Sequence, residues 1–190
     1  SAPQTIYKQV AELGLDVGLL VNNAGYGSYG TFESLPLESE LAMIDLACRA
    51  MMELTYRWIP DLKRRGRGGI IFLSSIVSQF PSPYMATYSA GKAFDFALAN
   101  ALYGELRPQG IDVLGLLPGT TATEFFEVAG MKRMDFLKAT PPQVVQTALR
   151  ALGRKPYVIH GYVNKLLVFF TKFLPMRWLI RIARFALQPR

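Results

Sequence analysis

Short apolar runs alternate along the chain with longer segments of helical spacing, and this alternation limits the fold more than any other feature. The apolar runs predict four strands, at residues 17–23, 68–75, 111–119 and 157–160. Helical spacing predicts three longer helices, at residues 39–64, 84–107 and 141–152. The two central strands are continuously apolar, which is typical of parallel strands buried on both faces. Strand–helix–strand order therefore predicts an α/β fold, with a parallel sheet covered by helices through right-handed crossovers.

The composition is that of a globular chain. A length of 190 residues suits about one domain, and 51% apolar residues are enough to bury a core. Cys48 is the single cysteine, so an internal disulfide framework is excluded, and no neighbouring Cys or His cluster suggests a metal site. Residues 1–16 hold no continuous apolar stretch, so we expect no secretory signal there. These features favour a reducing compartment such as the cytoplasm.

The net charge of +7 is unevenly distributed along the chain. No acidic residue follows Asp135, whereas lysines and arginines recur to the C-terminus. Such asymmetry marks the end of the chain as a separate functional question. We therefore divide the chain into residues 1–160, which carry the α/β pattern, and residues 161–190, a basic and hydrophobic C-terminal tail.

Small and polar residues follow three of the predicted strands. They are Asn22-Asn23-Ala24-Gly25, Ser74-Ser75 and Pro118-Gly119-Thr120-Thr121. In an open parallel sheet, ligands bind beyond the carboxyl ends of the strands, which meet at one edge. One such group would be ordinary turn chemistry, but three at the same edge predict a binding site.

A tyrosine and a lysine lie four residues apart in the stretch "YMATYSAGKAF", at Tyr88 and Lys92. On a helix these side chains are neighbours, and a lysine ammonium beside a phenol favours the phenolate. A phenol tuned toward neutrality can give or take a proton, and a nearby serine hydroxyl can stabilise charge on a substrate oxygen. This set of residues, Ser75, Tyr88 and Lys92, therefore predicts chemistry on a carbonyl or an alcohol. For an oxidoreductase, only a hydride carrier is missing from the set.

Four motifs in this order resemble the short-chain dehydrogenase/reductase family, over essentially the whole chain. They are N-N-A-G at 22–25, Ser75 placed 13 residues before Tyr88, Y-S-A-G-K at 88–92 and P-G-T-T-A-T at 118–123. The segment between the first two is also similar to the family's central helix and following strand. The resemblance implies a Rossmann-like, doubly wound sheet and an NAD(P)-dependent oxidoreductase.

The resemblance also implies roles for single residues. Tyr88 would be the general acid/base, Ser75 would orient the substrate carbonyl, and Lys92 would lower the Tyr88 pKa and bind the nicotinamide ribose. The cofactor, NAD or NADP, would lie beside Tyr88 and Lys92 and along Asn22, Ala24, Gly25, Pro118, Gly119 and Thr123.

One departure from the family is Ala47, which stands where the family has an asparagine in its central helix. In the family this asparagine helps to hold a water that continues the proton relay from the lysine. A methyl group cannot hold that water. Neighbouring water or backbone compensates, or Ala47 marks a decayed enzyme or a deliberate substitution, and the sequence does not choose among these.

A second departure is the glycine-rich T-G-x-x-x-G-x-G turn, which this sequence does not contain. The string "GYGSYG" at 25–30 belongs to the loop after N-N-A-G. Relative to the family, three strands and two helices are absent, roughly 75 residues by ordinary element lengths. We therefore expect an incomplete sheet, belonging to a fragment or completed by another chain, with the strand that ends at Asn22 as an unpaired hydrophobic edge. The missing part also carries the residue that discriminates NAD from NADP.

The tail at 161–190 combines large apolar residues with spaced lysines and arginines. Its apolar pieces are too short and too often interrupted to span a bilayer. One interpretation is a segment that lies on an anionic membrane surface. The alternative is a substrate lid or a homo-oligomer contact that packs on the open edge of the sheet. Nucleic acid is not expected as a partner, because the basic residues alternate with large aliphatic ones.

Residues 123–137 follow the Pro-Gly motif, where the family places its substrate-covering loop. The apolar side chains of this segment are Phe125, Phe126, Val128, Met131 and Phe136. They predict a hydrophobic substrate, such as a lipid or another bulky ketone, although phenylalanines also serve simple packing. The leading interpretation is thus an enzyme that acts on a carbonyl or alcohol. The rival is a non-catalytic protein of the same fold that acts as a membrane-associated or protein-binding module.

Overall fold

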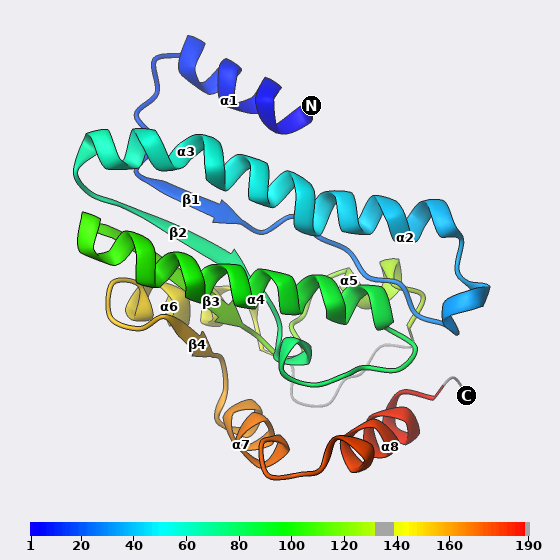
Figure 1. Cartoon of the computed structure of the whole chain (residues 1–190). Helices are drawn as coiled ribbons and strands as arrows, with labels where there is room; N and C mark the ends of the chain where they lie inside the picture. Colours follow the sequence, from blue (N-terminus) through cyan, green and yellow to red (C-terminus); the bar gives the residue numbers. More distant parts are fainter. Residues whose placement is uncertain (132–138, 189–190) are drawn as a thin grey trace.

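The computed structural model describes residues 1–131 and 139–188, and it confirms the predicted parallel sheet (Figure 1). The strands are β1 (Leu19–Asn22), β2 (Gly68–Leu73), β3 (Ile111–Leu117) and β4 (Tyr157–Ile159). They lie in the order β1-β2-β3-β4, and each neighbouring pair is parallel. The longer helices are α1 (Ala2–Glu12), α2 (Leu37–Ile44), α3 (Met51–Arg65), α4 (Ala86–Leu106), α6 (Pro141–Ala151), α7 (Tyr162–Thr171) and α8 (Met176–Leu187).

Helices cover both faces of this sheet, because side chains of a strand alternate between the two faces. Ile70 and Phe72 of β2 pack with residues of α3 and α4 in one buried cluster. Ile71, between them, points to the other face and packs with residues of α6. The continuous apolar runs of β2 and β3 therefore result from burial on both faces, as predicted.

The helix predicted at 39–64 is a single long rod with a change of winding inside it. α2 passes into a π-helical segment, η2 (Asp45–Ala50), which passes into α3 without a break. Gly66 ends the rod in the left-handed conformation with a φ of 72°. Only glycine adopts this conformation without steric cost, so the helix stops there and β2 begins two residues later.

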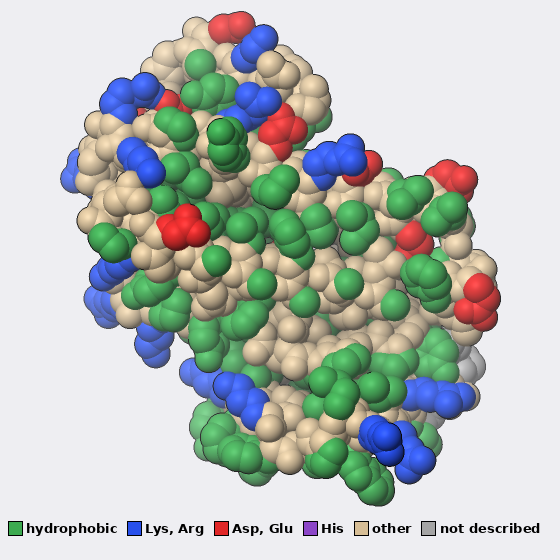
Figure 2. Space-filling view, in the orientation of Figure 1, with side chains coloured by type: hydrophobic (Ala, Val, Ile, Leu, Met, Phe, Trp, Pro, Cys, Tyr) green, Lys and Arg blue, Asp and Glu red, His purple; other side chains and the backbone are tan. Residues whose placement is uncertain are grey.

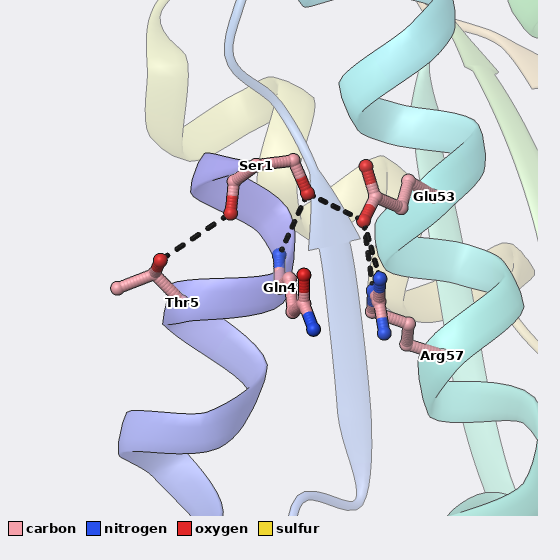
Figure 3. Close-up of polar contacts among 5 residues, drawn as sticks. All are labelled: Ser1, Gln4, Thr5, Glu53 and Arg57. Atoms are coloured by element: carbon pink, nitrogen blue, oxygen red, sulfur yellow. Dashed lines mark hydrogen bonds and ion pairs between the residues drawn. The ribbon is translucent and has the colours of Figure 1, made fainter.

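Helix α1 is a finding that sequence reasoning did not predict. Tyr7 of α1 donates a hydrogen bond to Asp61 of α3 at 2.8 Å, and its ring forms a T-shaped pair with that of Trp58. At the start of α1, the Ser1 hydroxyl accepts from Gln4 N and donates to Glu53 of α3, as Figure 3 shows. These contacts fix α1 on the outside of α3.

The Glu53 carboxylate links this cap to a charge on its own helix. Arg57 donates to the same carboxylate from one turn further along α3 (Figure 3). Hydrogen bonds from Ser1 and from Arg57 hold the pKa of Glu53 below its usual value. The contact is thus an ionised one, although it lies on the surface.

Strand β1 forms an edge of the sheet in the described residues, as the sequence predicted. It pairs with β2 on one side, and its Leu19 and Val21 side chains are 39% and 51% exposed. An apolar edge of this kind is a template for further pairing or covering.

The C-terminal tail folds into two helices, α7 and α8, joined by a short turn (Figure 1). They lie on the side of the molecule away from α1. Among the helices that the structure describes, none is long and apolar enough to cross a membrane.

Two leucines of the long α2–α3 rod test where the core lies. Leu62 has no exposed surface, whereas Leu41 is 57% exposed. We expect Leu62→Ala to lower the free energy of unfolding by about 2–5 kcal/mol, because it removes buried apolar surface and leaves a cavity. The matched change Leu41→Ala should alter it by about 0.5 kcal/mol or less. Chemical denaturation of both variants measures this, and equal losses would contradict the assigned core.

Candidate active site

The three predicted strand-end groups meet at one cavity of about 700 Å³, so the structure brings them together. The residues that line it from these groups are Asn23, Gly25, Ser74, Ser75, Pro118, Gly119, Thr120 and Thr121. Tyr88, Lys92 and Thr123 line it as well. The cavity also extends over β1 and α6, where Val21 and Val145 contribute to its wall.

Lys92 is a buried ammonium on α4, with a relative exposure of 7%. Its Nζ donates to the backbone carbonyl of Leu73 at 2.6 Å and to the Asp95 carboxylate at 3.0 Å. It also lies 5.9 Å from the centre of the Tyr88 ring. The ammonium is therefore held at the carboxyl end of β2, at the floor of the cavity.

Ser75 lies where β2 gives way to a short turn of helix, η3 (Ile76–Gln79). Its hydroxyl caps that turn by accepting from Val77 N at 3.4 Å, and the residue is 9% exposed. The neighbouring Ser74 donates its hydroxyl to the Lys92 carbonyl at 2.7 Å, which ties α4 to the end of β2. Sequence reasoning singled out Ser75 but gave Ser74 no role.

Tyr88 lies in the first turn of α4, next to Ser75 and to an aromatic side chain. Its ring lies 5.0 Å from that of Phe125, between centroids. Burial raises the pKa of Tyr88 to about 12, a hydrogen bond with Ser75 lowers it, and the charge of Asp95 raises it. The phenol is thus protonated at neutral pH.

The expectation of a lowered Tyr88 pKa is wrong for this structure, in which the net pKa is raised. The spacing of four residues does bring the two side chains together, but the ammonium is occupied by Leu73 and Asp95. Desolvation of the phenol outweighs every other influence, and Asp95 adds to it. Helical spacing shows that two groups are neighbours, whereas burial and third partners decide the direction of a pKa shift.

Gly25 leaves the space beside the Lys92 ammonium open. A Cβ at this position would meet Lys92 Nζ at 3.6 Å and nothing else within 4 Å. A glycine at the end of a parallel strand lets a ligand approach the backbone closely. The neighbouring Asn23 also lines the cavity, but the sequence predicted it only as part of a strand-end group and gave it no contact with the cofactor. The alternation of side chains after Asn22 is the signal that could have indicated it.

Asn22 and Ala24 lie beside the cavity but are not part of its wall. The buried Asn22 amide donates to the Thr55 hydroxyl of α3 at 2.9 Å. Ala24 is exposed. Their contact with a cofactor stays a prediction, and Asn22 already has a structural role in joining β1 to α3.

Gly119 lies against the tail. A Cβ at Gly119 would come within 2.5 Å of the Asn164 side chain of α7. Asn164 in turn donates to the His160 carbonyl at 2.7 Å. Glycine is therefore required here for close packing against α7, a reason that no sequence motif indicates.

Aromatic side chains close one side of the cavity, as the sequence suggested. Phe125, Phe126 and Met131 line it, and Phe125 lies so close to the backbone of Gly27 that a Cβ there would come within 2.7 Å. Val128 is 64% exposed and does not line the cavity, so its predicted place there is wrong. Phe136 lies outside the described residues.

The tail helices form another wall of the same cavity. Their lining residues are Leu167, Thr171, Leu179, Ile182, Ala183, Ala186 and Leu187. Tyr29, in the loop after β1, donates its hydroxyl to the Leu187 carbonyl at 2.6 Å and so holds the end of α8 in place. The lid interpretation of the tail is therefore favoured for its inner face.

Ala47 lies inside the π-helical segment η2 and is 7% exposed. It faces α4, since a Cβ at Gly91 would lie 3.5 Å from its methyl group. π-helical turns occur often at functional sites, and this one brings position 47 next to the helix that carries Lys92.

This geometry agrees with known proteins. The family description "short chain dehydrogenase" matches residues 1–133. The chain belongs to the short-chain dehydrogenase family. Among its relatives, dehydrogenase/reductase SDR family member 7B of Xenopus laevis is 30% identical over 185 residues, 92% of this chain and 57% of that protein. The very-long-chain 3-oxoacyl-CoA reductase of Podospora anserina is 33% identical over 154 residues, 77% of this chain and 44% of that protein.

Solved structures show the same short-chain dehydrogenase fold. A structure from work on 7beta-hydroxysteroid dehydrogenase stereoselectivity has a TM-score of 0.84 and 27% identity, and it covers 96% of this chain and 71% of its own. A short-chain dehydrogenase from Sphingobium yanoikuyae in complex with NADPH has a TM-score of 0.75 and 26% identity. The match covers 90% of this chain and 68% of that protein. The chain spans about half the length of the curated relatives above.

The high pKa of Tyr88 can be measured directly in this member of the short-chain dehydrogenase family. We expect Tyr88 to ionise near pH 12 in the protein without cofactor, above its ordinary value of 10.0. The difference in phenolate absorbance between wild type and Tyr88→Phe isolates this residue, and Tyr103→Phe on the same helix is the control. A Tyr88 titration at or below 10.0 would show that the phenol is less desolvated than the structure indicates.

Proposed function

We propose that the protein transfers a hydride between a nicotinamide cofactor and the carbonyl carbon of a bulky apolar substrate. The observation that carries this proposal is the meeting of Ser75, Tyr88 and Lys92 at the floor of a cavity with largely apolar walls. A proton donor, a hydroxyl and an ammonium in one desolvated place are the groups that reduction of a carbonyl requires.

Tyr88 would supply the proton in the direction of reduction. The bound cofactor would supply a hydride to the carbonyl carbon, and the oxygen would take the Tyr88 proton to give an alcohol. Ser75 would hold that oxygen by a hydrogen bond while charge develops on it. Lys92, 5.9 Å from the Tyr88 ring centre, would stabilise the phenolate that is left.

The residues at the strand ends fit a nicotinamide cofactor. Gly25 keeps the space beside Lys92 Nζ open, as a ribose hydroxyl close to the backbone would need. Asn22, Ala24, Pro118, Gly119 and Thr123 would complete this side of the cofactor site. NAD and NADP remain alternatives, because both share the nicotinamide and ribose that this half of the site would contact.

An apolar substrate is supported by the cavity walls and by the relatives. Phe125 and Phe126 lie on one side and the inner face of α8 on the other. The similar proteins described above include a very-long-chain 3-oxoacyl-CoA reductase and a structure from work on a 7beta-hydroxysteroid dehydrogenase. We infer a ketone attached to a long acyl chain or to a fused ring system.

Activity of the full-length protein should depend on Tyr88. We expect Tyr88→Phe to lower kcat for a long-chain or steroid ketone by at least about 100-fold, because the variant lacks the acidic proton. Tyr103→Phe, on the same helix, should keep wild-type activity. Consumption of NADPH and of NADH measures turnover and also decides between the two cofactors.

The rival function, a non-catalytic module of the same fold, gives the opposite results. It requires that the full-length protein reduces no ketone in a broad panel and that Tyr88→Phe changes nothing. Faster reduction of small polar ketones than of long-chain ones would support the proposed hydride transfer but overturn the proposal of an apolar substrate.

The outer face of the tail supports a second proposal, contact with an anionic membrane surface. Figure 2 shows hydrophobic side chains beside lysines and arginines over α7 and α8. The exposed apolar residues of the tail include Phe169, Phe170, Phe173, Met176, Trp178 and Phe185. Arg181 lies 5.7 Å from the centre of the Trp178 ring. Apolar side chains with adjacent cations suit the boundary between acyl chains and anionic headgroups.

Vesicle binding tests this surface. The full-length protein should bind vesicles that contain phosphatidylserine more tightly than vesicles of phosphatidylcholine, and salt should weaken the difference. Since each basic residue near such a surface contributes about 1 kcal/mol, the double change Arg177→Gln and Arg181→Gln should weaken binding about tenfold or more.

The control for this experiment is the pair Arg49→Gln and Arg64→Gln, on the rod formed by α2, η2 and α3. These arginines are exposed and lie outside the tail. Equal weakening by both pairs would mean a diffuse charge effect, and equal binding to the two kinds of vesicle would overturn the proposal.

A further inference from the structure

Asp95 is the most deeply buried carboxylate near the site, with a relative exposure of 1%. It lies on α4, one turn after Lys92, and its Oδ2 accepts from Lys92 Nζ at 3.0 Å. Among the described residues, its second oxygen, Oδ1, has no hydrogen-bond partner. The sequence analysis gave this residue no role.

Stability of the fold does not by itself require an ion pair at this place. Burying a charge costs free energy, and a buried ion pair often contributes no more than apolar residues of similar volume. Desolvation raises the pKa of Asp95 to about 6, against the attraction of Lys92, so its ionisation costs more free energy than that of an ordinary aspartate. A half-satisfied carboxylate next to a catalytic ammonium needs a chemical reason.

The position of Asp95 places it near η2 as well as beside Lys92. Gly91 and Asp95 are four residues apart and so share a face of α4. That face meets η2, since a Cβ at Gly91 would lie 3.5 Å from the Ala47 methyl group. The pKa of Cys48, the next residue of η2, is raised by burial, then by the charge of Asp95, while Lys92 lowers it. Asp95 therefore lies on the face of α4 that meets η2.

We propose that Asp95 is a positioning residue that holds the Lys92 ammonium in place at the carboxyl end of β2. Asp95 supplies this contact from within α4, one turn after the lysine. The titratable groups that face Asp95 are Lys92, Tyr88 and Cys48. This inference rests on the proposed hydride transfer. The contact between Asp95 and Lys92 on which it depends can nevertheless be tested without turnover.

Kinetics of the full-length protein test the catalytic part. Asp95→Asn should lower kcat about tenfold or more with little change in KM, because the loss affects the transition state and not substrate binding. It should also remove an acid limb from the pH profile of kcat near pH 6, where Asp95 loses its charge in the wild type. Asp112→Asn, which removes a carboxylate paired with Arg107 elsewhere, is the control and should keep wild-type kinetics. Unchanged kcat and an unchanged pH profile in Asp95→Asn would overturn the role of Asp95 altogether.

Carboxyl NMR of the protein labelled at aspartate needs neither turnover nor an Asp95 variant. The Asp95 carboxyl should titrate near pH 6 in the wild type. In Lys92→Met it should titrate at a higher pH, because the ammonium that favours its charged form is gone. The same titration midpoint of Asp95 in both proteins would overturn the proposed interaction between Asp95 and Lys92. If the wild type reduces no ketone, the proposed function fails, but this interaction is still measured.

Discussion

The buried ammonium of Lys92 is the interaction on which the rest of the site depends. It donates to the last carbonyl of β2, at Leu73, while the backbone carbonyl of Lys92 accepts from Ser74. This reciprocal contact ties α4 to the carboxyl end of β2 at a fixed register. Because a buried charge must be paired, α4 cannot slide along the sheet without leaving the ammonium unsatisfied. Ser75 and Tyr88 take their places from this anchor, one on each of the two elements that it joins.

Two helices far along the chain complete what this anchor begins. α7 and α8 place apolar side chains in the cavity wall, and Tyr29 holds the end of α8 through the Leu187 carbonyl. Gly119, at the end of β3, allows the close approach of Asn164. The tail therefore has two faces with different surroundings, one in the cavity and one that carries exposed aromatic and basic side chains (Figure 2). A substrate of low water solubility and a lipid surface would be brought together by such an arrangement.

The electrostatics of the site follow from burial rather than from the number of charges. Tyr88 has a pKa of about 12 although an ammonium lies near its ring, since desolvation and the Asp95 charge both disfavour the phenolate. Asp95 has a pKa of about 6 although Lys92 contacts it, because desolvation of the carboxyl outweighs the attraction of the ammonium. An oxidised nicotinamide carries a positive charge, which beside Tyr88 would favour the phenolate. Burial by the protein alone therefore keeps the Tyr88 phenol protonated and uncharged at neutral pH.

The sequence by itself determined the parallel sheet, the helix that carries Tyr88 and Lys92, and the edge where the strand ends meet. These follow from local rules: continuous apolar runs indicate buried parallel strands, and helical spacing makes residues four apart neighbours. Tertiary structure alone decided that Asn22 bonds Thr55, that α8 lines the cavity and that Asp95 accepts from Lys92. It also decided the direction of the Tyr88 pKa shift, against the prediction. The physical reason is that burial and long-range contacts depend on which elements pack together, and no spacing along the chain specifies them.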